Sequence, residues 1–209
     1  DLYRPYRPKR RTRATIAKEK GLEPLANVIL LQMTGEPVVK TAEEYVSEEK
    51  DVKTPEDAVA GAKDIIAESI SDNADYRTRI RELTFKEGVL TSAAKDAEAK
   101  TVYEMYYNFS EPVAKMAGHR ILAVNRGENE KILTVKIEAP VDKILSYLEK
   151  QIIVRDNRYT TGIIKEAIED SYERLIAPSI EREIRNQLTE TAEAGAIKVF
   201  GKNLEQLLL

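Results

Sequence analysis

Apolar residues in this 209-residue chain recur mainly three and four positions apart, which is the period of an amphipathic helix. The clearest helix starts at Thr54, whose hydroxyl can cap the first turn. Pro55 then occupies the first helical position and Asp57 the third. The apolar face of this helix is predicted to comprise Ala58, Ala62, Ile65, Ile66 and Ile70. Residues 71–73 end it and cap the next helix.

The same spacing predicts helices on both sides of this one. Residues 12–20 form a short helix that Gly21 ends, and residues 22–32 form a second one, with Pro24 tolerated in its first turn. The helix that follows residue 73 is predicted to bury Tyr76, Ile80 and Leu83.

The last third of the chain is strongly helical. Apolar stripes run through residues 141–152 and 164–176. Pro178 is expected to break the helix there, since a proline inside a helix costs about 3 kcal/mol. Glu181 and Arg185 lie one turn apart and are expected to pair. After the break, apolar residues recur every four positions at Ile180, Ile184, Leu188 and Ala192.

One segment, residues 132–137, alternates apolar and polar side chains instead, which is the period of a half-buried strand. Upstream, residues 121–124 are either a partner strand or part of a helix that starts near Gly118, and we favour the helix. Because a lone strand is unstable, residues 132–137 are expected to pair with a local hairpin, a second copy of the chain or a further domain.

These patterns predict a mainly α fold: a multi-helical bundle with a helix-turn-helix-like module and one short β-strand or hairpin. Three regions are expected. Residues 1–20 are a basic extended arm and first helix, and residues 21–88 are a small helical module of the helix-turn-helix-like kind. Residues 89–209 are a helical scaffold with a short β element near residues 132–138.

Composition narrows the class of protein. Charged residues make up 33% of the chain and the hydrophobic set 42%, as in a globular protein rather than a disordered one. The longest apolar runs, such as residues 28–31, are far shorter than the ~20 residues that cross a bilayer, so we expect no membrane partner. The chain has no Cys, which excludes disulfides and thiolate metal sites and is compatible with a cytoplasmic location.

Positive charge is concentrated at the start of the chain. Residues 1–20 carry a net charge of +6, whereas the whole chain is at −3. Such a segment either contacts the phosphates of nucleic acid or lies against the acidic remainder of the protein, and we slightly favour the second hypothesis. The candidate nucleic-acid-binding residues are Arg4, Arg7, Lys9, Arg10, Arg11 and Arg13.

Groups suited to catalysis are few. The chain has a single histidine, and its sequence contains neither a glycine-rich phosphate loop nor a His/carboxylate spacing suited to metal. We therefore expect no enzyme, no catalytic residue, no metal and no cofactor. His119 next to Gly118 is more simply explained as a structural residue that caps the following helix through its ring. A catalytic role would instead require a deep pocket around His119 with a perturbed carboxylate beside it.

Two further motifs have a structural and a functional interpretation. The aromatic cluster at residues 103–109 suits a core or interface better than a platform for stacked bases. Residues 15–22 resemble the turn of a DNA-binding helix-turn-helix, with a small residue and a corner glycine. Glu23 and Pro24 at the start of the second helix favour a plain helical hairpin over a recognition helix.

Several segments resemble bacterial Tex, the transcription accessory protein, in order and spacing across essentially the whole chain. One departure is Ala117 and Gly118, where the family would have Pro-Ser. The segments are residues 2–17 (LYRPYRPKRRTRATIA), 21–26 (GLEPLA), 61–68 (GAKDIIAE), 119–123 (HRILA), 126–128 (RGE) and 178–185 (PSIEREIR).

The resemblance implies a multidomain cytoplasmic protein that binds nucleic acid, RNA or DNA, and affects transcription. In that family a helical region like this one precedes an RNase-H-like domain, a helix-hairpin-helix module and an OB-fold RNA-binding domain. The start at Asp1 and the final Leu207, Leu208 and Leu209 suggest a piece cut from a longer chain. We therefore expect a helical scaffold fragment that positions nucleic-acid-binding domains and contacts the transcription machinery. The alternative is direct nucleic-acid binding through the basic arm and the helix-turn-helix-like segment.

Overall fold

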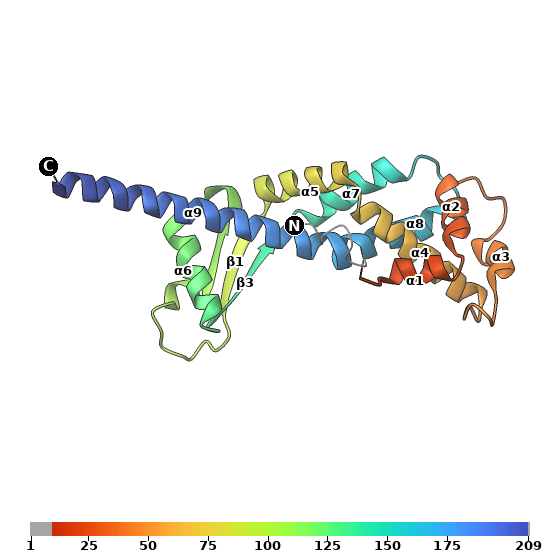
Figure 1. Cartoon of the computed structure of the whole chain (residues 1–209), viewed down its shortest axis with the longest axis horizontal. Coiled ribbons are helices and arrows are strands. Elements are labelled where there is room, and N and C mark those ends of the chain that lie inside the picture. Colours follow the sequence, from red (N-terminus) through yellow and green to blue (C-terminus); the bar gives the residue numbers. More distant parts are fainter. Residues whose placement is uncertain (1–9, 209) are drawn as a thin grey trace, which may run out of the picture. The chain divides into compact units, whose positions relative to one another are not determined.

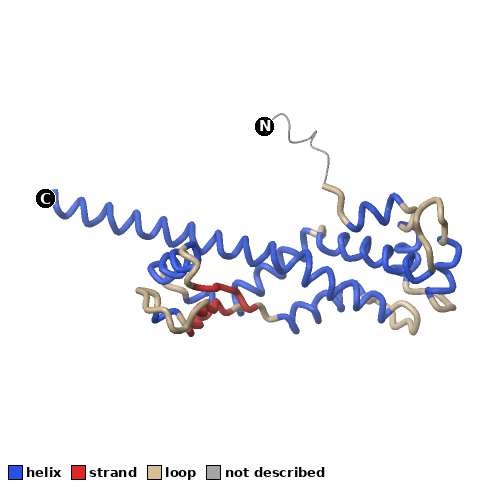
Figure 2. The backbone as a smooth tube through the Cα atoms, turned by 90° about the horizontal axis from the view of Figure 1, so that it is seen from below, coloured by secondary structure: helices blue, strands red, loops and turns tan. Residues whose placement is uncertain are grey.

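The structure, a computed structural model, describes residues 10–208. Helices dominate and the strands gather in one small sheet (Figure 2), which confirms the mainly α prediction. The chain forms two compact units. Unit 1 consists of residues 1–76 and 145–176, and unit 2 of residues 77–144 and 177–209. The region boundaries expected from the sequence, after residues 20 and 88, stay predictions.

Unit 1 is organised around α4 (Pro55–Ser71), which α1, α2, α3 and α8 all contact (Figure 1). The predicted start of α4 is confirmed, because the Thr54 hydroxyl accepts a hydrogen bond of 3.1 Å from the Asp57 N–H. All five residues predicted for its apolar face are buried, and Val59 and Ala67 are buried as well. A helix contacted from several sides buries more than one stripe. The partners of α4 are α1 (Arg13–Glu19), α2 (Glu23–Leu31), α3 (Val38–Ala42) and α8 (Thr161–Asp170).

The other elements of unit 1 connect these helices. A short 3-10 helix, η2 (Glu43–Tyr45), follows α3, and a π-helical segment, η5 (Ser171–Ile176), follows α8. Unit 1 also contains the first residues of α5 (Ala74–Glu87) and most of α7 (Val141–Ile152). Of the residues expected to be buried by α5, Tyr76 belongs to unit 1 and is half-buried. Ile80 and Leu83 belong to unit 2, where Ile80 is fully buried and Leu83 half-buried.

A buried glutamine joins the end of α2 to the segment after α7. Gln32 has a left-handed backbone (φ 58°) and is 4% exposed. Its amide nitrogen donates to the carbonyls of Leu30 (3.1 Å) and Ile152 (2.9 Å). Its amide oxygen accepts from the N–H groups of Val154 (3.0 Å) and Arg155 (3.2 Å). One side chain thus satisfies four backbone groups from two distant segments.

Unit 2 contains a three-stranded antiparallel sheet in the order β2-β1-β3. The predicted strand is confirmed as β3 (Leu133–Glu138), and its partner is β1 (Val89–Ala94) rather than a neighbouring hairpin. The sequence missed β1 and β2 (Asn108–Pro112). β1 has the sequence VLTSAA, whose small and polar residues carry a weak strand signal. Two short 3-10 helices, η3 (Glu104–Tyr106) and η4 (Val113–Lys115), flank β2.

Unit 2 also contains most of α5, the first residues of α7, and the two helices α6 (Gly118–Asn129) and α9 (Ala177–Leu208). α6 contacts both β3 and α9, and it contains residues 121–124, which confirms the helical prediction there. Gly118 lies at the crossing with α9, where an added Cβ would be 3.4 Å from the Cα of Ala192. The residues predicted to recur on α9 every four positions are all buried, namely Ile180, Ile184, Leu188 and Ala192.

The expected pairing of Glu181 with Arg185 is wrong. Arg185 instead donates to Asn125 Oδ1 and to Glu128 Oε1 of α6, both at 2.8 Å. Glu181 Oε1 accepts a hydrogen bond of 2.9 Å from the N–H of Ile137. Ile137 lies on β3, an edge strand, so its outward N–H needs a partner. Tertiary partners have replaced a weak pair within the helix.

The expected break at Pro178 is also wrong, because the chain is helical from Thr161 to Leu208. The π-helical segment η5 ends at Ile176, two residues before the proline. In a π-helix the hydrogen bonds already reach back five residues instead of four. The missing proline N–H therefore falls where the regular ladder is interrupted anyway, which removes most of its cost.

Candidate functional site

The basic segment divides into two parts in the structure. Arg4, Arg7 and Lys9 lie outside the described residues. Arg10 and Arg11 are exposed just before α1, and Arg11 Nη2 forms an ion pair of 2.6 Å with Glu19 Oε2 at the other end of α1. Arg13, which begins α1, lines a groove in unit 1.

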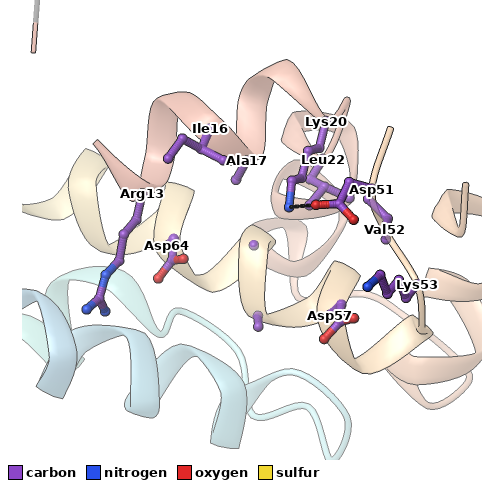
Figure 3. A pocket seen from close by; sticks show the side chains of 12 residues that line it. Arg13, Ile16, Ala17, Lys20, Leu22, Asp51, Val52, Lys53, Asp57 and Asp64 are labelled. Atoms are coloured by element: carbon purple, nitrogen blue, oxygen red, sulfur yellow. Dashed lines mark ion pairs between the residues drawn. The ribbon is translucent and has the colours of Figure 1, made fainter. Parts of the chain in front are cut away.

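The start of α1 fixes the direction of Arg13. Thr12 and Thr15 form a reciprocal cap, in which the Thr15 N–H donates to the Thr12 hydroxyl (3.1 Å) and the Thr12 N–H donates to the Thr15 hydroxyl (2.7 Å). This capping box sets the first helical position at Arg13. Its side chain then lies on the face of α1 that borders α4 (Figure 3).

The groove lies between α1, the turn at residues 51–53 and the first half of α4 (Figure 3), and has a volume of about 380 Å³. Arg13 and Lys20, seven residues apart on α1, are on one side, and Asp57 and Asp64, seven apart on α4, are on the other. Because seven residues make two helical turns, each pair occupies one face of its helix. Lys20 Nζ lies 3.9 Å from Asp51 Oδ2.

A close approach of small residues forms the floor of the groove. A Cβ added to Gly61 of α4 would lie 2.3 Å from Leu22 Cδ1 and 3.3 Å from Ala17 Cβ. Any side chain at this position would force the buried Leu22 side chain to move. Gly21, with φ +75°, provides the left-handed corner between α1 and α2.

Arg13 faces acidic groups of its own unit. Burial raises the pKa of Asp64 above its ordinary value, while the positive charges of Arg174 and Arg13 oppose that rise. Arg174 Nη2 is 2.8 Å from Asp170 Oδ2 and 3.9 Å from Asp64 Oδ1. Its hydrogen bond lowers the pKa of Asp170, with further help from the charges of Arg174, Arg13 and Lys63. The charge of Arg13 is thus electrostatically matched to helices α4 and α8.

The segment of helix-turn-helix type does form a helix, a short turn and a second helix. The second helix, α2, has the sequence EPLANVILL and contains no Lys or Arg. Its exposed residues include Glu23, Pro24, Asn27 and Leu31. Such a surface is poorly suited to the phosphates that flank a recognition helix, which favours the plain helical hairpin.

His119 does not cap α6. The cap position is Ala117, with no side-chain hydrogen bond, so that prediction is wrong. His119 is exposed and lines a groove of about 550 Å³ between α6 and α9. None of the residues that line this groove is acidic; they include Leu122, Ala196, Val199 and Phe200. The perturbed carboxylate that a catalytic role would require is therefore not part of this groove.

The aromatic cluster lies in the core of unit 2, as its structural interpretation predicted. Tyr103 and Tyr106 are buried. The rings of Tyr106 and Phe109 meet edge to face at 5.3 Å. The hydroxyl of Tyr103 donates to Glu130, and that of Tyr107 donates to the Ala99 carbonyl at 2.7 Å. The two buried rings, Tyr103 and Tyr106, are not available for stacking with bases.

The groove residues Lys20, Asp51, Asp57 and Asp64 and the Gln32 network were not identified from the sequence. The seven-residue spacing of the bases on α1 and of the acids on α4 was visible, but nothing local indicates that these two helices meet. Within residues 10–208, no group of three or more His, Cys, Asp or Glu residues could hold a metal ion. Among the helices of this same part of the chain, none has the length and apolarity needed to cross a membrane.

The fold and the groove define a mainly helical, two-unit protein whose mixed charges face one another across packed helices. Residues 34–200 match the family model described as Tex central region-like, and the chain belongs to this family. The predicted membership of the Tex family is thereby confirmed.

Three relatives set the scale of the match. The protein YdcI of Bacillus subtilis (strain 168) is 55% identical over 212 aligned residues, which cover 100% of this chain and 30% of that protein. Transcriptional accessory protein Tex of Neisseria gonorrhoeae is 34% identical. The alignment covers 100% of this chain and 28% of that protein. S1 RNA-binding domain-containing protein 1 of Homo sapiens is 33% identical. The alignment covers 95% of this chain and 21% of that protein. The chain spans less than a third of the length of these relatives.

Proposed function

We propose that this chain is a non-enzymatic helical scaffold of a Tex-like transcription accessory protein, which positions nucleic-acid-binding domains and contacts the transcription machinery. The proposal places it in the cytoplasm, where bacterial transcription occurs. The names of two relatives, transcriptional accessory protein Tex and S1 RNA-binding domain-containing protein 1, support nucleic acid as the eventual partner. Contact with that nucleic acid is then made mainly by parts of the longer protein outside the matched segment.

The observation that carries the scaffold proposal is the second half of α9. The row of apolar residues that is buried from Ile180 to Ala192 continues at the same four-residue spacing as Ala196, Phe200, Leu204 and Leu208. All described residues after Ala192 are exposed, and Phe200 is 70% exposed. An exposed apolar row on a rigid helix is a surface on which further protein can be held.

The pairing of the basic segment supports the same proposal. Arg11 is paired with Glu19, and Arg13 lies in the field of Asp64 and Asp170. Charges used within the unit release fewer counterions when a nucleic acid approaches.

One observation favours the alternative, direct nucleic-acid binding. The Arg11–Glu19 pair is exposed, at 68% and 59% of the two side chains. Exposed pairs of this kind contribute only about 0–1 kcal/mol, so a phosphate can displace the carboxylate. Arg10 and Arg13 are also exposed.

Titration of duplex DNA and single-stranded RNA at several salt concentrations separates the two proposals. A scaffold binds more weakly than micromolar, and neutralising Arg10, Arg11 and Arg13 to Gln leaves the salt slope unchanged. Direct binding predicts micromolar or tighter affinity. The slope then falls by about 0.9 for each lost phosphate contact on duplex DNA and about 0.7 on a single strand. The control neutralises three exposed bases of unit 2, Lys95, Lys131 and Lys136, with the same change in net charge.

A further inference from the structure

The end of unit 1 at which α2 meets the segment after α7 exposes an unusual set of side chains. Leu31 and Met33, on either side of the buried Gln32, are 64% and 65% exposed, and Val154 is 71% exposed. They are neighbours in space because Gln32 bonds to the N–H groups of Val154 and Arg155. Figure 1 shows the cyan segment after α7 beside the end of α2. Three large apolar side chains are thus exposed on two segments that contact one another.

The same surface is basic. Residues 150–159 (KQIIVRDNRY) contain Lys150, Arg155 and Arg158 but only one acid, Asp156. All three bases are exposed, and the ion pairs found within residues 10–208 involve none of them. This is unlike Arg11 and Arg174, which are paired. Residues 21–209 carry a net charge of −9, so three exposed bases within ten residues form a locally positive segment of an acidic chain.

Polar contacts hold this surface in place. Asn157 Nδ2 donates to the carbonyl of Thr34 (3.0 Å), and Asn157 Oδ1 accepts from the N–H of Tyr159 (2.9 Å). The guanidinium of Arg158 lies 5.1 Å from the centre of the Tyr159 ring. A preorganised surface loses less conformational entropy when a partner binds.

We propose that Leu31, Met33, Val154, Arg155 and Arg158 form a docking surface for an acidic protein segment that carries apolar side chains. Charge complementarity selects acidic residues in the partner, and the apolar residues need apolar counterparts. Arg, Met and aromatic residues are the types enriched at protein interfaces. Nucleic acid fits less well, because three exposed aliphatic side chains offer nothing to phosphate and the Tyr159 ring is covered by Arg158. The proposal does not depend on the role of α9.

The test uses the isotope-labelled 209-residue chain and three probes followed by amide NMR shifts. The first probe is a 15-residue peptide of Asp and Glu with Leu or Phe at every third or fourth position. The second has Lys in place of every acid, and the third is a 15-nucleotide poly(U) RNA. The acidic peptide is expected to shift the amides of residues 31–33 and 154–159 saturably, with a Kd of about 10–500 µM. The basic peptide is expected to leave them unchanged.

Two double substitutions test whether Arg155 and Arg158 bind the acidic peptide. Replacing Arg155 and Arg158 by Ala is expected to weaken the acidic peptide about tenfold, whereas Lys131→Ala with Lys136→Ala, in unit 2, leaves the Kd within twofold. All four side chains are exposed, so the fold is retained and helical circular dichroism verifies it. Shifts caused by poly(U) but not by the acidic peptide would overturn the proposal in favour of nucleic acid. Saturation at other residues, or no shift with any probe, would refute it outright.

Discussion

Replacing Gln32 by methionine removes four side-chain hydrogen bonds, three of which join the end of α2 to residues 152–155, while keeping the length of the side chain. The lost bonds are those to Leu30, Ile152, Val154 and Arg155. Four bonds at about 0.5–1.5 kcal/mol each amount to about 2–6 kcal/mol. Val154 and Arg155 are exposed, so their N–H groups can turn to water. We therefore expect the lower half of that range, about 2–4 kcal/mol.

The left-handed backbone at residue 32 does not contribute to the difference in stability between the wild type and Gln32→Met. Gln32 has φ 58°, a conformation that costs any residue with a Cβ, and methionine bears the same cost as glutamine. The matched control is Gln151→Met on α7, which makes the same chemical change at an exposed site in unit 1.

Urea unfolding measures the effect. With a slope of about 2 kcal/mol per molar, the midpoint of unit 1 should fall by about 1–2 M for Gln32→Met and by less than about 0.2 M for the control. Hydrogen exchange should show protection lost first at the amides of Val154 and Arg155. Equal midpoints for the two variants would show that the network is not stabilising.

Replacing Gln32 by glutamate tests the direction in which stability depends on pH. In Gln32→Glu the carboxylate still accepts from Val154 and Arg155 but faces the carbonyls of Leu30 and Ile152 where the amide donated. Burial and these carbonyls should raise the pKa of the introduced carboxyl above its unfolded value. Stability should then be lost as the pH rises through that folded pKa, and partly regained on acidification. A variant that is more stable at pH 7 than at pH 4 would contradict this account.

Two further predictions concern unit 1, the first of them its groove. Gly61→Ala should destabilise the unit by about 1–3 kcal/mol in urea unfolding, because the added Cβ would lie 2.3 Å from Leu22 Cδ1. The control, Gly162→Ala, places its Cβ where no neighbouring atom lies within 4 Å and should not destabilise the unit. Equal effects of the two substitutions would refute the packing argument. Asp170→Asn should destabilise by about 0.3–0.5 kcal/mol at pH 7, since the Asp170 side chain is 40% exposed and its partner Arg174 is one turn away. Because the pKa of Asp170 is lowered from 3.8, this difference should vanish as the pH falls below about 4, and a difference that persists at pH 2 would contradict the role of ionisation.

The sequence predicted correctly those elements whose structure depends on residues close together in the chain. The start of α4, its apolar face and the strand β3 followed from the spacing of side chains and from capping chemistry. β1 was missed because its residues, such as Ser92 and Ala93, have little preference for strands and are held there by pairing on both sides. The helix break predicted at Pro178 was wrong because the π-helical segment before it has no sequence signature.

The candidate sites depend on contacts between distant segments, which spacing along one helix cannot reveal. The sequence identified Arg13 as basic but not Asp64 as its neighbour, and it gave Gln32 no role. The free bases Arg155 and Arg158 could be seen in the sequence, yet only the structure distinguishes them from paired bases such as Arg174. Family resemblance supplied the context of transcription, but it assigns no partner to any of these residues.

Unit 1 is assembled from segments that leave the ribosome at different times. Its central helix α4 bonds to α8 and η5 through pairs about a hundred positions apart, such as Lys63 with Glu166 and the Ala67 carbonyl with Ser171. At about 5–20 residues per second, α4 waits roughly 5–20 s for those partners. During that interval α1, α2 and α3 can already pack on α4, but the face that α8 and η5 will cover stays exposed, so translation speed and chaperone access should influence the yield of folded protein.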